Sequence, residues 1–180
     1  MFPHYAEPVA RAGTPAIAAL LAAGVPHEVL HYHHDPRNES FGDEAAEALA
    51  RDQSVDAEQV FKTLVLALPK RPGSGPGRDI GFGVAVLPVP AKLSLKAAAA
   101  ALGVPKATMA ERAAAERSSG YVIGGISPFG QRRPLPTVVD ESALRWDRVL
   151  CSAGKRGWDV ALHPRDLISL TNATIAAIRA

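Results

Sequence analysis

The stretch QVFKTLVLAL, from Gln59 to Leu68, decides the fold because its density of apolar residues predicts a largely buried β-strand. A second apolar run, IGFGVAVLPV from Ile80 to Val89, predicts a partner strand. Between them lies PKRPGSGPGRD (69–79), which is too rich in proline and glycine to pack and predicts a long hairpin loop. We therefore expect the two strands to belong to one domain, and the pattern leaves the role of loop 69–79 open.

Further elements are expected on both sides of this hairpin. A hydroxyl cap and a first-turn proline at Thr14-Pro15 open a helix that ends at Gly24, and Ser94 caps a helix closed by Gly103. Other helices are predicted from residue 41, over 110–116 and after residue 164, and strands over 27–34, 107–109, 137–139, 148–151 and 158–162, with a turn at SAGKRG. Strands and helices alternate without a regular βαβ period. This order predicts an α+β (mixed α/β) fold, in which the sheet can curl into a barrel.

Size and composition indicate a globular protein. The chain has 180 residues, 47% of them hydrophobic and 21% charged, which suits one domain with a substantial core. We expect residues 1–13 to form an irregular tail and residues 14–180 to form the domain. The net charge of +2 excludes a strongly basic nucleic-acid coat but permits a local basic patch.

The cellular context is also an expectation from composition. No apolar run approaches the roughly 18 residues that cross a bilayer, and the start lacks the pattern of a secretory signal. Cys151 is the only cysteine, so an intramolecular disulfide and a thiolate metal cluster are excluded. We expect a cytoplasmic protein without membrane association, in which Cys151 is a small buried residue at a strand end.

Lys62 is unusual because it interrupts a strand that is otherwise fit for burial. Alternation places Phe61 and Thr63 on one face of the strand, and Lys62 and Leu64 on the other. A lysine there must reach water, bind a partner or face a cleft. The pattern leaves open whether Lys62 faces a cleft or protects an edge strand from aggregation.

The segment YVIGGISPFGQ, from Tyr121 to Gln131, is either a tight turn or a backbone that lies directly against a ligand. Gly124 and Gly125 could present amides to a developing oxyanion, which is a strong catalytic device. Ser127 is a weak candidate nucleophile, because GGISPFG is not the GxSxG elbow and no histidine and acid are marked for it.

Two polar segments remain. In HYHHDP (31–36), His31 and His33 could both bind zinc, but no HExxH motif or cysteine pair supplies the third and fourth ligands that zinc needs. The preferred interpretation is that Tyr32 lines a pocket. In SAGKRGWD (152–159), a charged turn is one interpretation. The other is a polar wall in which Ser152 and Asp159 hold an amine or a ribose while Lys155 and Arg156 bind phosphate.

Taken together, these segments resemble the YbaK family of Cys-tRNA(Pro) deacylases, which are related to the insertion domain of bacterial prolyl-tRNA synthetase. The resemblance runs from Thr14 to the C-terminus, and rests on TPAIAALLAAGVPHEVLHYHHDP, FGDEAAEAL, VFKTLVL, SSGYVIGGISPFGQRRPLPTVVDE and CSAGKRGWDV. It implies a mixed sheet curled into a barrel-like core flanked by helices. SSGY and SAGKRG differ slightly from the usual STGY and SGGKRG, and the loop 69–79 is longer than usual, a difference that bears on the docking of tRNA or a synthetase.

The resemblance also implies a site without metal or cofactor. Lys62 and Gly124 take the catalytic positions. The substrate-binding positions that it implies fall on Tyr32, Phe41, Thr63, Pro128, Ser152 and Asp159. From the glycine loop itself we add Gly125, Ile126 and Ser127 as substrate-binding residues, and the polar-wall interpretation adds Lys155 and Arg156 as contacts to tRNA phosphate.

The implied reaction is hydrolysis of the ester that joins a mischarged cysteine to tRNA(Pro), with the substrate's own thiol attacking its carbonyl and releasing a thiolactone. The implied partners are aminoacyl-tRNA and prolyl-tRNA synthetase, and we expect a monomer. Two alternatives stay open: an inactive module that binds tRNA or a synthetase, and a deacylase for another substrate such as Ala-tRNA(Pro).

Overall fold

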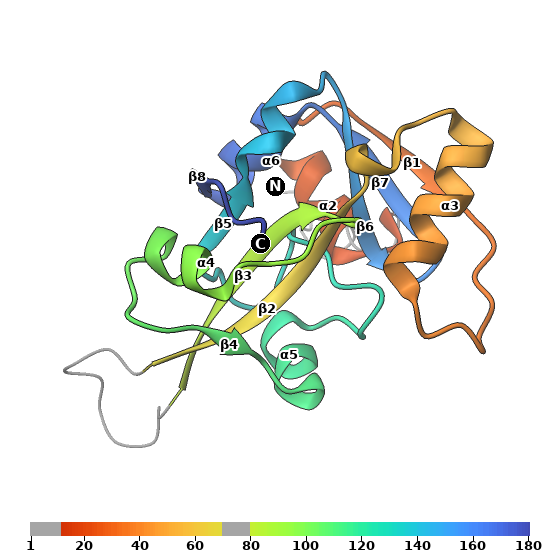
Figure 1. The fold of residues 1–180 in the computed structure, drawn as a ribbon. Helices are drawn as coiled ribbons and strands as arrows, with labels where there is room; N and C mark the ends of the chain where they lie inside the picture. The colour runs from red at the N-terminus through yellow and green to blue at the C-terminus, as the bar shows by residue number, and fades with distance from the viewer. Residues whose placement is uncertain (1–11, 70–79) are drawn as a thin grey trace, which may run out of the picture.

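The computed structural model describes residues 12–69 and 80–180, so most of the predicted tail and all but Pro69 of the predicted loop lie outside it. The described strands form a five-stranded sheet in the order β4-β2-β3-β5-β8 and a three-stranded sheet in the order β1-β7-β6 (Figure 1). Their bounds are β1 His27–His31, β2 Phe61–Pro69, β3 Ile80–Pro88, β4 Thr108–Met109, β5 Thr137–Asp140, β6 Val149–Lys155, β7 Trp158–Leu162 and β8 Thr174–Ala176.

The predicted hairpin forms the centre of the five-stranded sheet. β2 and β3 pair antiparallel from Phe61 opposite Pro88 to Pro69 opposite Ile80, which confirms the two apolar strands. β5 pairs parallel with β3, and β8 pairs parallel with β5, so the sheet is mixed. The prediction of further helix at the C-terminus is wrong here: α6 ends where Asn172 turns left-handed (φ 50°), and the chain then adds β8 to the sheet.

The three-stranded sheet differs from the prediction at two ends. β6 continues to Lys155 through an irregularity between Ser152 and Lys155, so the predicted six-residue turn is mostly strand. A β-bulge adds a residue to one strand and re-aims its side chains, which alternation alone does not reveal. β1 ends at His31 instead of residue 34, and the next amide, of Tyr32, donates to the Gly157 carbonyl at 2.9 Å.

α2 and α4 begin where the caps at Thr14 and Ser94 predict, whereas the helix expected over 110–116 spans Arg112–Ser119. Thr14 accepts a hydrogen bond from the Ile17 amide and donates one to the Ala153 carbonyl, so the cap also joins its helix to β6. The helices are α2 Pro15–Ala22, α3 Phe41–Gln53, α4 Leu95–Ala101, α5 Arg112–Ser119 and α6 Pro164–Thr171, with short 3₁₀ turns at Ala57–Gln59 and Glu141–Arg145. Figure 1 shows α3 and α4 on opposite sides of the strands.

The core forms on three levels. Between the sheets, a cluster that includes Val86, Phe129 and Val160 combines both sheets with α2 and α6. A second cluster packs α4 against the outer face of the five-stranded sheet, and a third packs α3 against Leu150 and Ala161 of the three-stranded sheet. Cys151 is fully buried in the central cluster, as a structural residue would be.

These features confirm the α+β class. An isolated bridge between Val60 and Leu150 joins the two sheets, and no closed barrel is found in the part of the chain that the structure describes. None of the helices within residues 12–69 and 80–180 has the length and apolar content of a bilayer span.

Candidate active site

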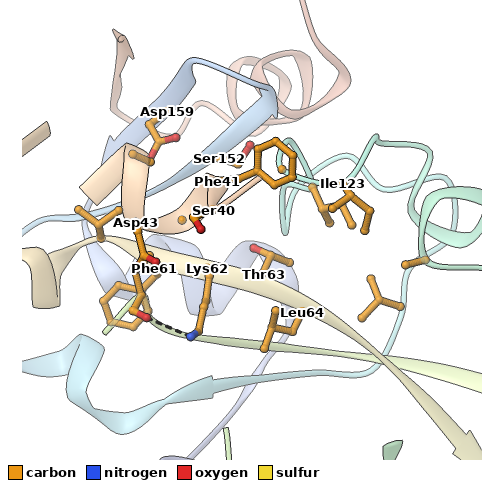
Figure 2. Close-up of a pocket in the computed structure, with 18 of the residues that line it drawn as sticks. Ser40, Phe41, Asp43, Phe61, Lys62, Thr63, Leu64, Ile123, Ser152 and Asp159 are labelled. Atoms are coloured by element: carbon orange, nitrogen blue, oxygen red, sulfur yellow. Dashed lines mark hydrogen bonds between the residues drawn. The ribbon is translucent and has the colours of Figure 1, made fainter. Parts of the chain in front are cut away.

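A pocket of about 390 Å³ opens where the edge of β2 meets α3, the β6–β7 hairpin and residues 121–131, which we call the glycine segment (Figure 2). Eight of the residues assigned to the site from the sequence line it: Tyr32, Phe41, Lys62, Thr63, Gly124, Ile126, Ser152 and Asp159. These side chains come from segments more than a hundred residues apart, so the fold itself assembles the pocket.

The edge of β2 is available to the pocket because its neighbour is short. β4 pairs with β2 at Leu66 and Ala67, which leaves the first half of β2 along the pocket wall. Phe61 packs in the central cluster, whereas Leu66 packs beneath α4, so the predicted alternation of faces along β2 is correct. Lys62 and Thr63 therefore leave the strand in opposite directions (Figure 2).

The Lys62 ammonium is held by backbone carbonyls after β3. Its Nζ donates to the carbonyl oxygens of Val89 at 3.0 Å and Ala91 at 2.6 Å. Burial lowers the pKa of Lys62, and the nearby Asp43 carboxylate opposes that shift. An ammonium has three N–H donors, so two carbonyl bonds leave one donor for a ligand.

Thr63 and Asp159 are two further polar residues of the pocket lining. The Thr63 hydroxyl is buried without a hydrogen-bond partner among the described residues. Asp159 is 4% exposed, and burial raises the pKa of its carboxyl to about 7. A buried hydroxyl without a partner is unfavourable, and so is the ionised form of a buried carboxyl, so a polar or cationic ligand in the pocket would stabilise both groups.

Tyr32 and Ser152 stand close to this carboxyl. Ser152 is the register partner of Asp159 across the β6–β7 hairpin, and its Oγ accepts a hydrogen bond from the Gly154 amide at 3.2 Å. Burial, with the Asp159 charge as a smaller cause, raises the pKa of Tyr32, so its phenol stays neutral. The neutral Tyr32 hydroxyl can donate a hydrogen bond as well as accept one.

The glycine segment is held in place by side chains on either side. Tyr121 Oη donates to the Phe129 carbonyl at 2.6 Å, and Gln131 Nε2 donates to the Ser127 carbonyl at 2.9 Å. The segment is therefore closed by its own residues, and it provides a fixed wall rather than a loose turn.

Gly124 is required by its packing against Phe41. Its φ is +86°, and a Cβ at this position would lie 2.5 Å from Cγ of the Phe41 ring. The bare backbone therefore accommodates an aromatic side chain of the pocket, in addition to any ligand that approaches it.

Five residues of the predicted site do not line the pocket: Gly125, Ser127, Pro128, Lys155 and Arg156. Ser127 is fully buried, and its Oγ accepts a hydrogen bond from the Phe129 amide. Lys155 lies over the Trp158 ring at 5.0 Å, and Arg156 lies over the Phe41 ring at 4.6 Å.

The histidines of the 31–36 segment make local contacts. His31 packs edge-on against Trp158, and His34 Nδ1 lies 2.7 Å from the Glu44 carboxylate. Within residues 12–69 and 80–180, no group of three or more potential metal-ligating side chains is found.

Sequence reasoning missed Ser40, Asp43 and Met109, which also line the pocket, and Glu116, which supports it. Asp43 lies in the first turn of α3, where the helix dipole favours an acid, and its proximity to Lys62 comes only from the tertiary structure. Alternation and capping describe one element at a time, so they carry no signal for a residue whose role comes from a neighbouring element.

Known proteins share both the sequence pattern and this fold. The family model described as the aminoacyl-tRNA editing domain matches residues 43–170. A protein of Enterococcus faecalis (strain ATCC 700802 / V583), EbsC, named as a candidate Cys-tRNA(Pro)/Cys-tRNA(Cys) deacylase, is 36% identical over 134 residues, which cover 74% of this chain and 76% of that protein.

Two solved structures agree in fold. One, described as a candidate trans-editing enzyme for prolyl-tRNA synthetase, superposes with a TM-score of 0.76 at 23% identity and covers 97% of this chain and 98% of its own. The other, the hypothetical protein APE2540, gives a TM-score of 0.71 at 21% identity over 89% of this chain and 96% of its own.

The chain belongs to the aminoacyl-tRNA editing domain family, the YbaK-type family that its sequence resembles.

Proposed function

We propose that this chain hydrolyses the ester bond between a mischarged cysteine and the 3′ end of tRNA(Pro). The observation that carries the proposal is that one pocket gathers Lys62, Gly124, Ser152 and Asp159, the positions at which the resemblance implies the site. Family membership supports an aminoacyl-tRNA substrate, and the name of the Enterococcus faecalis relative supports cysteine as the amino acid.

The polar wall suits the amino end of the substrate. An ammonium placed beside Asp159 would stabilise the ionised carboxylate, which burial otherwise disfavours. Ser152 and Thr63 offer hydroxyls for the amine or the ribose, and Thr63 has no competing partner among the described residues. This arrangement would orient the aminoacyl group before any chemistry occurs.

Lys62 and Gly124 suit the charge of the ester and the nucleic acid. The remaining N–H donor of Lys62 is available to a ribose or phosphate oxygen. We assign the Gly124 amide to the carbonyl oxygen, where a fixed donor stabilises the negative charge that develops during attack. Phe41 and Tyr32 provide apolar surface for the small side chain or the terminal adenine.

The substrate supplies the nucleophile in this proposal. Its thiol sulfur bonds to its own carbonyl carbon, the bond from that carbon to the ribose oxygen breaks, and the thiol proton is transferred to the ribose oxygen. The products are a thiolactone, which water then opens to cysteine, and tRNA with a free terminal hydroxyl. An intramolecular attack of this kind has an effective concentration on the order of 10⁵ M or more when it is well oriented.

The burial of the protein's own candidate nucleophiles supports this route. Ser127 and Cys151 are both fully buried outside the pocket lining, and none of the described histidines lines it. A serine in the pocket, such as Ser152, therefore lacks a histidine base beside it. Orientation and oxyanion stabilisation remain the contributions of the protein.

Recognition of the tRNA is a separate part of the proposal. We propose that residues 14–180 form the editing domain, that it acts as a monomer, and that prolyl-tRNA synthetase supplies much of the selection for tRNA(Pro). The low net charge of +2 supports weak RNA binding by the chain alone, with an affinity that falls as salt rises.

Incubation of the purified chain with Cys-tRNA(Pro), with and without prolyl-tRNA synthetase, tests the function. The expected result is loss of the aminoacyl ester far above the spontaneous rate. If the ester persists at its spontaneous rate in both reactions, the chain binds without catalysis and the proposed function is wrong.

A further inference from the structure

Arg156 occupies a position behind the glycine segment that phosphate binding does not explain. Its guanidinium is outside the pocket lining, and its Nε donates to the carbonyl oxygen of Ile123 at 2.9 Å. The same guanidinium lies 4.6 Å from the centre of the Phe41 ring. Both contacts are internal to the protein, and they use the Nε–H donor and one face of the guanidinium.

The Ile123 carbonyl belongs to the same peptide group as the Gly124 amide. In a trans peptide, the C=O and N–H bonds lie in one plane and point in opposite directions. A hydrogen bond that fixes the Ile123 carbonyl toward Arg156 therefore directs the Gly124 N–H away from Arg156. Gly124 lines the pocket and Arg156 does not, and we take the side away from Arg156 to be the pocket side.

The preceding peptide group is fixed as well. Glu116 Oε1, from α5, accepts a hydrogen bond from the Ile123 amide at 2.9 Å. Ile123 is thus held at its amide by an acid and at its carbonyl by a guanidinium, from two different elements. Two charge-assisted contacts on one residue restrain the rotation that would turn the Gly124 amide out of position.

Phe41 completes the support. Gly124 packs so closely on one part of the ring that a Cβ would lie 2.5 Å from it, while the Arg156 guanidinium covers the ring at 4.6 Å. The backbone amide of Arg156 also lies behind Gly125, where a Cβ would be 3.1 Å away. The ring, the guanidinium and the segment therefore pack as one unit.

We propose that Arg156 is a positioning residue that orients the Ile123–Gly124 peptide group so that the Gly124 amide faces the carbonyl of an aminoacyl ester. This inference rests on the proposed function, because it takes the Gly124 amide as the donor to the substrate. It assigns Arg156 a role in the rate of the reaction rather than in the binding of tRNA phosphate.

Arg156→Lys and Arg156→Gln test the proposal through kcat and KM for Cys-tRNA(Pro) at several salt concentrations. Lysine keeps the charge but lacks the planar guanidinium and its Nε–H, so both variants should behave alike. We expect kcat to fall about 10–100-fold, which is less than the roughly 100–1,000-fold cost of removing an oxyanion donor because the Gly124 amide is displaced rather than lost, with KM within about threefold of wild type. The slope of log kcat/KM against log salt should stay at its wild-type value, because no phosphate contact is removed.

The controls separate positioning from charge. Arg165→Gln removes an exposed arginine on α6 that does not line the pocket, and it should keep wild-type kcat and KM. The proposal is overturned if Arg156→Lys retains wild-type activity while Arg156→Gln raises KM and reduces the salt slope, which is the behaviour of a phosphate contact. Wild-type kcat in both variants overturns it as well.

A second measurement does not depend on activity. In ¹⁵N–¹H spectra of the folded proteins, Arg156→Lys should shift the Gly124 and Ile123 amide resonances and speed exchange of the Gly124 amide, whereas Arg165→Gln should leave both unchanged. Unaltered Gly124 signals in Arg156→Lys would refute positioning. If the wild-type chain proves unable to deacylate any aminoacyl-tRNA, the proposed function fails, and the spectra still decide whether Arg156 orients the peptide.

Discussion

Ser152 and Asp159 are register partners across the β6–β7 hairpin, and both side chains line the pocket. The irregularity that follows Ser152 lies beside this pair, at the end of β6 nearest the glycine segment. Burial raises the pKa of the Asp159 carboxyl, so this wall of the pocket favours a neutral carboxyl until a cation binds beside it.

Asp159→Asn should change how stability depends on pH. Burial raises the pKa of Asp159 from its usual 3.8 to about 7, so between these values the unfolded chain releases a proton that the folded chain keeps. The wild type should therefore lose stability as pH rises from about 4 to 7. Above about pH 7 the loss in free energy of unfolding stays constant, on the order of 1–4 kcal/mol. Urea unfolding at pH 4.5 and pH 8 measures the free energy of unfolding of both proteins. From pH 4.5 to pH 8, the Asp159→Asn protein should become more stable relative to the wild type. Parallel pH profiles would show that Asp159 ionises freely in the folded state.

Lys62→Ala should reduce kcat/KM for Cys-tRNA(Pro) by at least about 100-fold, because a fixed positive charge is lost from the site. Some stability should also be lost, about 1–3 kcal/mol, since two hydrogen bonds from an ammonium disappear. The matched control is Lys92→Ala, which removes an exposed lysine outside the pocket lining and should leave activity unchanged. Retention of more than half of the activity by a folded Lys62→Ala protein would exclude Lys62 from the reaction.

Gly124→Ala tests the contact between the glycine segment and Phe41. A methyl group would overlap the ring at a left-handed backbone position, so we expect a loss of stability of about 1–3 kcal/mol and little remaining activity. Gly103→Ala isolates the backbone effect, because Gly103 also has a positive φ (+71°) but nothing within 4 Å of its would-be Cβ. The Gly103 variant should lose about 1 kcal/mol and keep full activity. Equal losses of activity in the two variants would show that backbone strain, and not the contact with Phe41, matters.

Ser127→Ala should keep a measurable part of the activity. The Ser127 hydroxyl is fully buried and accepts a hydrogen bond from the Phe129 amide, so its loss should cost about 1 kcal/mol of stability without removing a reacting group. Rapid-quench assays with labelled cysteinyl-tRNA provide the measurement. A trapped cysteinyl-enzyme, together with complete loss of activity in this variant, would identify Ser127 as the nucleophile.

The sequence predicts most of the fold where a single element decides the outcome. The apolar hairpin around Lys62 and the caps at Thr14 and Ser94 agree with the structure. The C-terminal residues 174–176 were expected in a helix but form β8, because parallel pairing with β5 overrides the helical preference of their surroundings. The extension of β6 was missed because glycines in SAGKRG resemble a turn, whereas Gly154 lies within the irregular strand.

The sequence predicts those residues of the candidate site whose location follows from a single strand or from a family motif. Alternation separated Lys62 from Thr63, and the resemblance indicated Ser152 and Asp159. The contacts of Arg156 with Ile123 and Phe41 depend on the packing of segments that are far apart in sequence, so no local pattern could show them. The phosphate role expected for Arg156 stays a prediction beside the positioning role that we propose, and the salt dependence of the Arg156 variants distinguishes the two.

The rate of deacylation of Cys-tRNA(Pro) compared with Ser-tRNA(Pro) tests the central claim most directly, because the two substrates differ in one atom of the side chain. With the purified wild-type chain, we expect Cys-tRNA(Pro) to be deacylated at least about 100-fold faster, since the intramolecular sulfur attack is unavailable to the serine hydroxyl. An amine nucleophile should also capture the cysteine-derived thiolactone by opening its thioester bond. Equal rates for the two substrates, with no trapped thiolactone, would mean that an activated water attacks the ester and would contradict the account.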